Sequence, residues 1–232
     1  MENNLYLLNR NIISCKKCER LINYCNKVSN IKKRMYSTDN YWGKPVPSFG
    51  DPNARVLIIG LAPAAHGANR TGRMFTGDKS GSWLFNTLAK FGFSNNEESI
   101  HKEDGLNLND IYISSMVHCA PPKNKPSKQE IDTCSFYLQE EIQLLQNLKV
   151  VVTLGRIAFE GYCKLLRKKG YDWVENDKKP SFGHGSEFKT PDGKTLISSF
   201  HPSQQNTQTG KLTREMFDDI FLKVKEALTN KS

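Results

Sequence analysis

The sequence predicts a three-layer α/β/α fold with a short, mostly parallel, four-stranded central sheet. Short apolar runs rich in β-branched residues alternate along the chain with longer segments in which apolar residues recur every three or four positions. This alternation is typical of parallel strands whose two faces are covered by helices. The 232 residues show no internal repeat and suffice for one hydrophobic core, so we expect a single domain over 1–232.

The expected elements alternate between strand and helix in chain order. The strands are short, apolar and bounded by Gly, Pro or polar turns, and they fall at 55–61, 111–117, 150–154 and 195–200. The helices each have one apolar face, and they fall at 81–91, 128–148, 156–169 and 213–228. Two polar stretches are expected to be surface connections, 27–41 and 168–186.

Charge and hydropathy narrow the class of partner. Lys and Arg number 33 against 24 Asp and Glu, and the net charge of +9 favours a polyanionic partner such as nucleic acid. The alternative is a solubilising, lysine-rich surface. No apolar run approaches the roughly 18 residues of a membrane span, and residues 1–10 lack the order of a secretory signal. We therefore expect a cytoplasmic protein without a membrane partner, where structural disulfides are uncommon.

Four of the six cysteines are spaced like the ligands of a metal site. Cys15 and Cys18 form a C-x2-C pair, whose thiolates can reach one metal or cluster from a single turn. Cys119 follows the second expected strand, and Cys134 lies early in the next helix. Four thiolates suit zinc or a 4Fe-4S cluster, and the spacing alone does not choose between them. The two other cysteines are expected to be core or surface thiols, Cys25 and Cys163.

Two polar loops follow the first and the fourth expected strands. The first, 60–81, reads GLAPAAHGANRTGRMFTGDKSG, and the second, 201–210, reads HPSQQNTQTG. The carboxyl ends of parallel strands commonly carry ligand-binding loops. Phe75 lies among glycines, where backbone can approach a ligand closely, so its ring is a candidate floor for a planar base. The alternative is a core anchor for the loop.

These loops and the cysteine spacing together resemble the uracil-DNA glycosylase superfamily, and most closely its family 5, the B-type enzymes that carry an iron-sulfur cluster. The segment GLAPAAHGANRTGRMFTGD is similar to the first motif of that family. Residues 119–122 (CAPP) are similar to its strand-end CxPP segment, and 201–203 (HPS) to its second motif. The similarity covers nearly the whole chain, from residue 15 to about 228.

The resemblance implies a structural 4Fe-4S cluster and no catalytic metal. The cluster would tie the N-terminal segment, about 1–40, to the loop that flanks the active site. The implied ligands are Cys15, Cys18, Cys119 and Cys134.

The resemblance also implies roles in the active site. Phe75 would lie against a flipped uracil, His201 would donate a hydrogen bond to uracil O2, and Asp78 would act through water. The residues alone leave a second role open for Asp78, the N-cap of the helix that begins near Ser80. Further substrate-binding residues would be Ala65, Asn124 and Asn206. Candidate contacts to DNA phosphates are Arg70, Arg73, Lys79, Ser203 and Gln204.

Two departures argue against family 4 of the same superfamily. Alanines surround Pro63 where other branches carry Asp, Asn or Glu in the first motif. Ser115 stands where family 4 enzymes carry a uracil-reading Asn. The missing first-motif acid also keeps open a different class, a cysteine-metal nucleic-acid-binding module without catalysis. The intact set of Phe75, Asp78, His201 and Asn206 weighs against that alternative.

The predicted function is hydrolysis of the N-glycosidic bond of deoxyuridine in DNA, leaving an abasic site. We expect a monofunctional repair enzyme that acts on double-stranded DNA as a monomer, in the cytoplasm and associated with the nucleoid. Other deaminated or modified bases are expected as secondary substrates.

Overall fold

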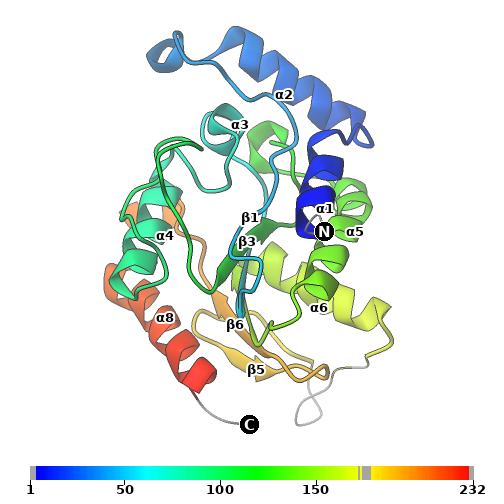
Figure 1. The fold of residues 1–232 in the computed structure, drawn as a ribbon, viewed down its shortest axis with the longest axis vertical. Helices are drawn as coiled ribbons and strands as arrows, with labels where there is room; N and C mark the ends of the chain where they lie inside the picture. Colours follow the sequence, from blue (N-terminus) through cyan, green and yellow to red (C-terminus); the bar gives the residue numbers. More distant parts are fainter. Residues whose placement is uncertain (1–3, 172, 174–178, 230–232) are drawn as a thin grey trace.

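The computed structural model describes residues 4–171, 173 and 179–229, and it has three layers, helices on either side of a sheet (Figure 1). The sheet has six strands in the order β1-β3-β2-β4-β6-β5. Their bounds are β1 Phe49–Gly50, β2 Val56–Gly60, β3 Ile111–Ser115, β4 Val150–Leu154, β5 Glu187–Lys189 and β6 Thr195–Ser199. The predicted α/β/α class is therefore confirmed.

The predicted number of four strands was wrong. The four expected strands are the central ones, β3, β2, β4 and β6, and they pair in parallel. The two further strands, β1 and β5, pair antiparallel at the two edges. They are only two and three residues long and contain no fully buried residue, so they lack the apolar run by which a strand is found in a sequence.

The parallel strands end together at one edge of the sheet. Every residue of these strands is buried, as expected when helices cover both faces. Gly60 of β2 is level with Ser115 of β3, and Leu154 of β4 is level with Ser199 of β6. The loops that follow β2, β3 and β6 consequently start at the same edge of the sheet, with β4 between β2 and β6, and this edge is where α/β folds bind ligands.

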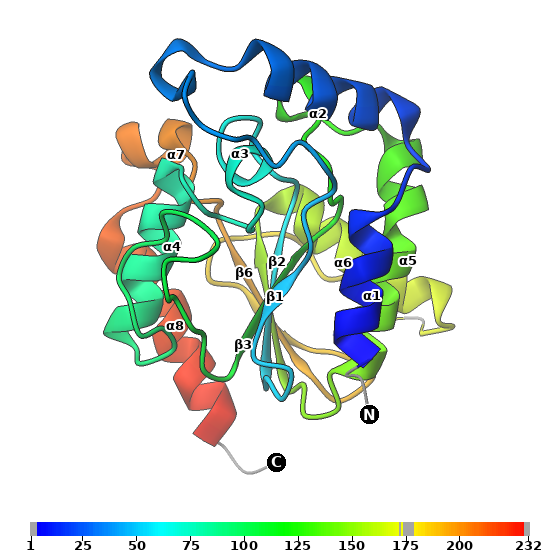
Figure 2. The ribbon, with the colours of Figure 1, turned by 45° about the horizontal axis from the view of Figure 1, so that its top comes forward.

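The helices fall into two layers and one crossing segment. One layer holds α4 Lys79–Lys90 and α8 Arg214–Thr229, and the other holds α1 Asn4–Ile13, α5 Lys128–Leu144 and α6 Arg156–Lys168 (Figure 2). The helix α2 Glu19–Ile31 and the turn η1 Arg34–Tyr36 cross above the carboxyl edge of the sheet. The short helices of the loops are α3 Ala68–Thr71, η2 Pro122–Asn124 and α7 Gln204–Gln208.

The N-terminal part is more ordered than the sequence analysis expected. The predicted connection 27–41 contains the end of α2 and the whole of η1, so that prediction was partly wrong. The described part of 168–186 contains no strand, and no helix beyond the last residue of α6. Residues 172 and 174–178 of that connection, and 1–3 and 230–232 of the predicted domain, lie outside the described residues. No helix in the described ranges is both long and apolar enough to cross a membrane.

A carboxyl group is buried between α5 and the sheet. Glu141 has no solvent exposure, and it accepts a hydrogen bond from the hydroxyl of Ser114 on β3. Burial raises the pKa of Glu141 to about 7, whereas a Glu in an unfolded chain titrates near 4.3. Between these two values the folded protein holds a proton that the unfolded chain has lost, so the free energy of unfolding falls as the pH rises.

We predict that Glu141→Gln removes this pH dependence. The substitution keeps the size of the side chain but does not titrate. At about 1.4 kcal/mol per pKa unit, its free energy of unfolding should rise relative to wild type by about 3 kcal/mol between pH 4.5 and pH 7.5. Urea unfolding at several pH values measures the difference. A difference that stays constant with pH would contradict a carboxyl that folds in its protonated form.

Candidate active site

A cavity of about 1010 Å³ opens at the carboxyl edge of the sheet. Its walls come from both predicted loops and from the turn η1 above them. The volume is large enough for a nucleotide-sized ligand. Predicted site residues that line it are Ala65, Arg70, Phe75, Asp78, Lys79, Asn124, His201, Ser203 and Gln204.

Phe75 forms a floor that glycines make possible. Its side chain is 9% exposed and belongs to the hydrophobic core, yet it also lines the cavity. A Cβ on Gly60, at the end of β2, would lie 2.8 Å from the ring, and one on Gly81 would lie 1.7 Å from the Phe75 carbonyl oxygen. The backbone of Phe75 is left-handed, with φ at 54°, a conformation that costs energy in a residue other than Gly. The two expected roles, core anchor and pocket floor, are therefore compatible.

His201 faces Phe75 from the loop after β6. The two rings stack at 27° with 5.9 Å between their centres. The backbone of this loop is fixed because the carbonyl oxygen of His201 accepts hydrogen bonds from the Ser203 N–H, at 2.7 Å, and from the Asn206 amide, at 2.8 Å. Burial lowers the pKa of His201 to about 4. The imidazole is consequently neutral near pH 7, with one N–H donor available.

Asp78 is the N-cap of α4, as the sequence allowed. Its Oδ1 accepts a hydrogen bond of 2.9 Å from the Gly81 N–H. Its other oxygen, Oδ2, lies beside Gly67, where a Cβ would be only 2.3 Å away. Burial raises the pKa of this carboxyl, opposed by the backbone N–H groups of Gly81 and Ser80 and by the charge of Arg70. Because the cap occupies Oδ1, the second oxygen is the one placed to act on a ligand.

Two arginines predicted to contact phosphates form ion pairs within the protein, and only Arg70 of the two lines the cavity. Arg73 is only 6% exposed, and its guanidinium pairs with Asp104 at 2.6 Å and donates to the hydroxyls of Thr76 and Ser99. Arg70 pairs with Asp39 at 2.6 Å. For Arg73 the phosphate role was wrong, since the buried guanidinium cannot reach a backbone outside. Lys79 is exposed at the rim of the cavity.

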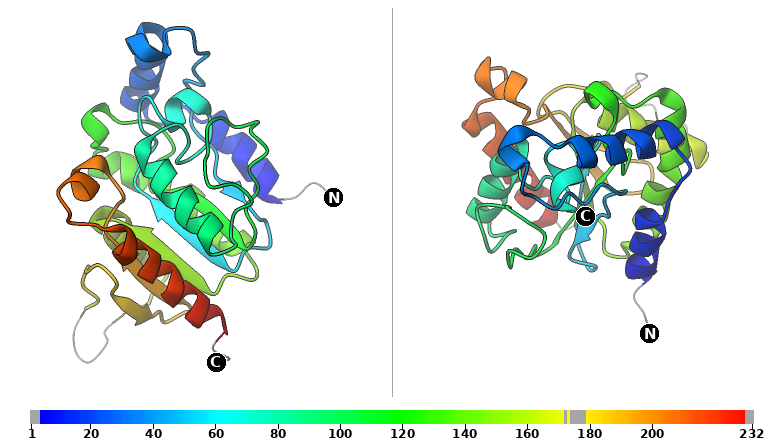
Figure 3. Two further views of the ribbon diagram at one scale, coloured as in Figure 1. Left: turned by 90° about the vertical axis from the view of Figure 1, so that its left-hand side faces the viewer. Right: turned by 90° about the horizontal axis from the view of Figure 1, so that it is seen from above.

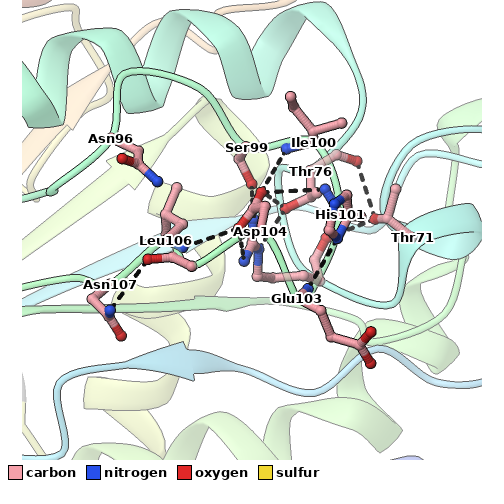
Figure 4. Close-up of polar contacts among 12 residues, drawn as sticks. Thr71, Thr76, Asn96, Ser99, Ile100, His101, Glu103, Asp104, Leu106 and Asn107 are labelled. Carbon is pink, nitrogen blue, oxygen red and sulfur yellow. Dashed lines mark hydrogen bonds and ion pairs between the residues drawn. The ribbon is translucent and has the colours of Figure 1, made fainter.

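The hydrogen bonds of Arg73 hold one wall of the cavity in place, and Arg73 itself does not line the cavity. Asp104 also accepts hydrogen bonds from the backbone N–H groups of Ile100, His101 and Leu106 (Figure 4). Although burial alone would raise it, these bonds and Arg73 hold the pKa of Asp104 well below its usual range. The network joins the first-motif loop to residues 99–106, and it fixes that wall of the cavity.

Asn124 and Asn206 differ in whether their side chains can contact a ligand in the cavity. Asn124 is exposed on η2 and lines the cavity. Asn206 does not line it, because its side chain bonds to the backbone of its own loop. His184, whose loop the sequence analysis noted, accepts a hydrogen bond from the Phe200 N–H just before His201. The sequence analysis passed over several residues of the wall, among them Lys33, Met35, Tyr36, Glu98, Ser99 and Ile100. The basic composition of 27–41 was a signal for the first three, and no local signal marks 98–100.

The four predicted cysteine ligands line a second, small cavity between α2, α5 and the end of β3. Burial raises the pKa of Cys134 to about 12, and it raises that of Cys18 as well. Cys25 lies outside this lining, with its thiol against the Ala120 carbonyl oxygen at 3.6 Å. Within the described residues, no three His, Cys, Asp or Glu side chains are grouped closely enough for a single metal ion. Four soft donors around one enclosed space fit a cysteine-ligated iron-sulfur group.

The large cavity thus combines three chemical functions. A planar heterocycle can stack on the aromatic floor, a neutral imidazole can donate to an oxygen of that heterocycle, and a carboxylate can orient water beside it. The corresponding side chains in the cavity wall are those of Phe75, His201 and Asp78.

Comparisons with known proteins show which family the chain resembles over most of its length. A family model described as "Uracil DNA glycosylase superfamily" matches residues 47–225. A "Type-5 uracil-DNA glycosylase" of Thermus thermophilus is 44% identical over 216 residues, 92% of this chain and 94% of that protein. Another of the same name from Pyrobaculum aerophilum is 41% identical over 210 residues, 90% of this chain and 87% of that protein. A "Type-4 uracil-DNA glycosylase" of Sulfurisphaera tokodaii is 29% identical over 180 residues, 72% of this chain and 66% of that protein.

Proposed function

The chain belongs to the uracil-DNA glycosylase superfamily, within which it groups with the type-5 enzymes, and we infer that it excises uracil from DNA in base-excision repair. It hydrolyses the N-glycosidic bond of deoxyuridine and leaves an abasic site. One observation carries the assignment of residues: two loops more than a hundred residues apart bring Phe75, Asp78 and His201 to the same cavity.

We propose that uracil enters this cavity after rotating out of the DNA stack. Extrusion of a base costs a few kcal/mol, which the enzyme offsets by stacking and by polar contacts to the edge of the base. The Phe75 ring offers the stacking surface, and its backbone is held in place by the close approach of Gly81. The Asn124 amide lines the same cavity and would contact the edge of the base.

Breakage of the bond leaves negative charge on the departing uracil and positive character on the sugar. We propose that the neutral His201 imidazole donates its N–H to uracil O2 and stabilises the departing anion. Asp78 Oδ2 orients the attacking water and offsets the charge on the sugar. Both side chains are partly shielded from solvent. Electrostatic contacts are stronger in such surroundings than in water, because the effective dielectric constant is lower.

The protein acts on uracil-containing DNA, and we propose the finer features of its partners. The substrate is double-stranded, the enzyme is a monomer built as one domain, and it works in the cytoplasm at the nucleoid. Ser115 lines the cavity with a small side chain, which supports a pocket wide enough for hypoxanthine or modified pyrimidines as secondary substrates.

We propose further that Cys15, Cys18, Cys119 and Cys134 hold a 4Fe-4S cluster. Such a cluster would link α2 to the end of β3 and to α5, and so hold the crossing segment over the active site. Its role would be structural, since the cysteines line a cavity separate from the one that contains His201.

We predict that Cys119→Ala removes the cluster. Anaerobically purified wild type should contain about four iron atoms per chain with visible absorption, and the variant should lose both and unfold at a lower temperature. Cys163→Ala is the matched control, because Cys163 is also buried but lies off the cysteine cavity. One zinc ion per wild-type chain, without labile sulfide, would contradict the cluster.

We predict that Gly67→Ala slows excision without unfolding the protein. The new methyl group would meet Asp78 Oδ2 at 2.3 Å and push the carboxylate away. A displacement of this kind at a reacting group can cost about a hundredfold in rate. Single-turnover excision gives the rate, and circular dichroism checks the fold. Gly183→Ala is a matched control, because a Cβ there would meet another flexible side-chain oxygen, Ser186 Oγ at 2.6 Å, and Gly183 does not line the cavity. An unchanged rate would show that Oδ2 does not act in the reaction.

Release of free uracil from DNA tests the function itself. Purified protein is incubated with an end-labelled duplex containing one G:U pair, the released base is identified by mass spectrometry, and abasic sites are cleaved with alkali. Uracil in solution and cleavage at its position support the glycosylase. Binding without release of uracil or hypoxanthine would leave the catalytically inactive cysteine-metal binding module.

A further inference from the structure

We propose that Met35 is a wedge that enters the DNA duplex and occupies the gap left by the extruded base. The proposal rests on the proposed function and adds a surface that the reaction residues do not include. Extrusion leaves an unstacked hole in the duplex, and DNA-distorting proteins commonly fill or pry open such steps with an apolar side chain, including Met.

Met35 stands at the mouth of the active-site cavity. Among the described residues, two large apolar side chains line this cavity while remaining well exposed: Met35, at 65%, and Ile100, at 59%. Met35 belongs to η1, which lies beyond the end of α2 and above α3 (Figures 1 and 3). Ile100 belongs to the wall that the Arg73 network holds. Either side chain could face DNA on geometry alone.

Charge distinguishes the two sides of the mouth. Met35 follows Lys32, Lys33 and Arg34, and the last two are exposed. Around Ile100 the exposed charged residues are three acids and one lysine, Glu97, Glu98, Glu103 and Lys102. DNA binds where Lys and Arg can neutralise its phosphates. The duplex should therefore approach the Met35 side of the cavity mouth and avoid close contact with the Ile100 side.

The backbone around Met35 is fixed to the base-binding loop. The Arg70 guanidinium lies 3.9 Å from the centre of the Tyr36 ring and pairs with Asp39 at 2.6 Å. The Trp42 N–H donates to the Arg70 carbonyl oxygen at 2.9 Å. Arg70 itself lies on α3, within the first-motif loop. Met35 is therefore held at a set position relative to the base pocket while its side chain stays in solvent, which lowers the entropy cost of insertion.

A wedge has a signature that a purely structural residue lacks. It acts only where a duplex has a gap to fill, so its removal should slow excision from double-stranded DNA and spare single-stranded DNA. Loss of one stacking contact of this kind corresponds to about a tenfold change in rate.

The test compares Met35→Ala, Met35→Leu and Ile31→Ala with wild type. Ile31 is the matched control, because it is an exposed apolar residue of the same crossing segment that does not line the cavity. Single-turnover excision is measured on one uracil-containing strand, alone and paired in a duplex. We expect Met35→Ala to be about tenfold slower on the duplex, with an unchanged single-strand rate, while Met35→Leu and Ile31→Ala match wild type on both. An unchanged duplex rate, an equal loss on single strands, or the same loss in Ile31→Ala would overturn the proposal. Wild type that releases no uracil from either substrate would instead refute the proposed function.

Discussion

Replacement of His201 by Ala is expected to slow uracil excision by about 10²- to 10³-fold. A single pre-aimed donor to a developing oxyanion typically contributes that much, and His201 is held by its own backbone bonds and by stacking on Phe75. Single-turnover rates on a G:U duplex measure the loss. Binding of the uncleaved duplex should change little, because the donor acts mainly on charge that develops during the reaction.

The His201 prediction includes a pH dependence. Because burial lowers the pKa of His201 to about 4, the imidazole is neutral from about pH 5 upward, and its titration should not reduce the rate between pH 6 and pH 8. His101→Ala is a control, since His101 is exposed and does not line the cavity. A rate in His201→Ala within a factor of three of wild type would contradict the donor role.

Asp78→Asn is expected to lower the excision rate by about a hundredfold or more. The substitution removes the negative charge that orients water and offsets the positive charge on the sugar. A positioned acid or base typically contributes about 10²- to 10⁴-fold to a rate. Asn is as good an N-cap as Asp, so α4 should keep its first turn and the free energy of unfolding should change by less than about 1 kcal/mol. Denaturant unfolding and single-turnover excision separate the two roles.

The comparison with Asp78→Ala completes that test. Ala abolishes the cap as well as the charge, at a cost of about 1 kcal/mol in stability. If Asn retains the wild-type rate while Ala does not, Asp78 serves the helix alone. Since burial raises the pKa of Asp78, the wild-type rate should also fall as the pH decreases and the carboxyl is protonated.

Much of the fold could be predicted because its signals are local. The central strands are continuous apolar runs, and the loops after β2 and β6 carry recognisable motifs. The helix α1 could also have been predicted from the sequence, since Leu5, Leu8 and Ile12 have helical spacing, and the structure buries all three. It was not predicted, because α1 spans only 10 residues and gives a short periodic pattern.

The rest depended on contacts between distant residues. Nothing in the sequence near Arg73 indicates that its guanidinium will be buried in an ion pair with Asp104, 31 residues away. The turn η1 lines the cavity only because α2 crosses the sheet edge, which no motif encodes. Asp78 was singled out because the family resemblance implies a carboxylate there, with an N-cap as the alternative role. The structure shows that its Oδ1 serves the cap.

The most direct test of the account is single-turnover uracil excision from one G:U duplex by wild type, Asp78→Asn and His201→Ala side by side. The account predicts release of uracil by wild type and losses of about a hundredfold or more in each variant, with DNA binding and folding retained. Wild type that binds the duplex without releasing uracil, or variants that excise it as fast as wild type, would contradict the assignment of this cavity as the active site.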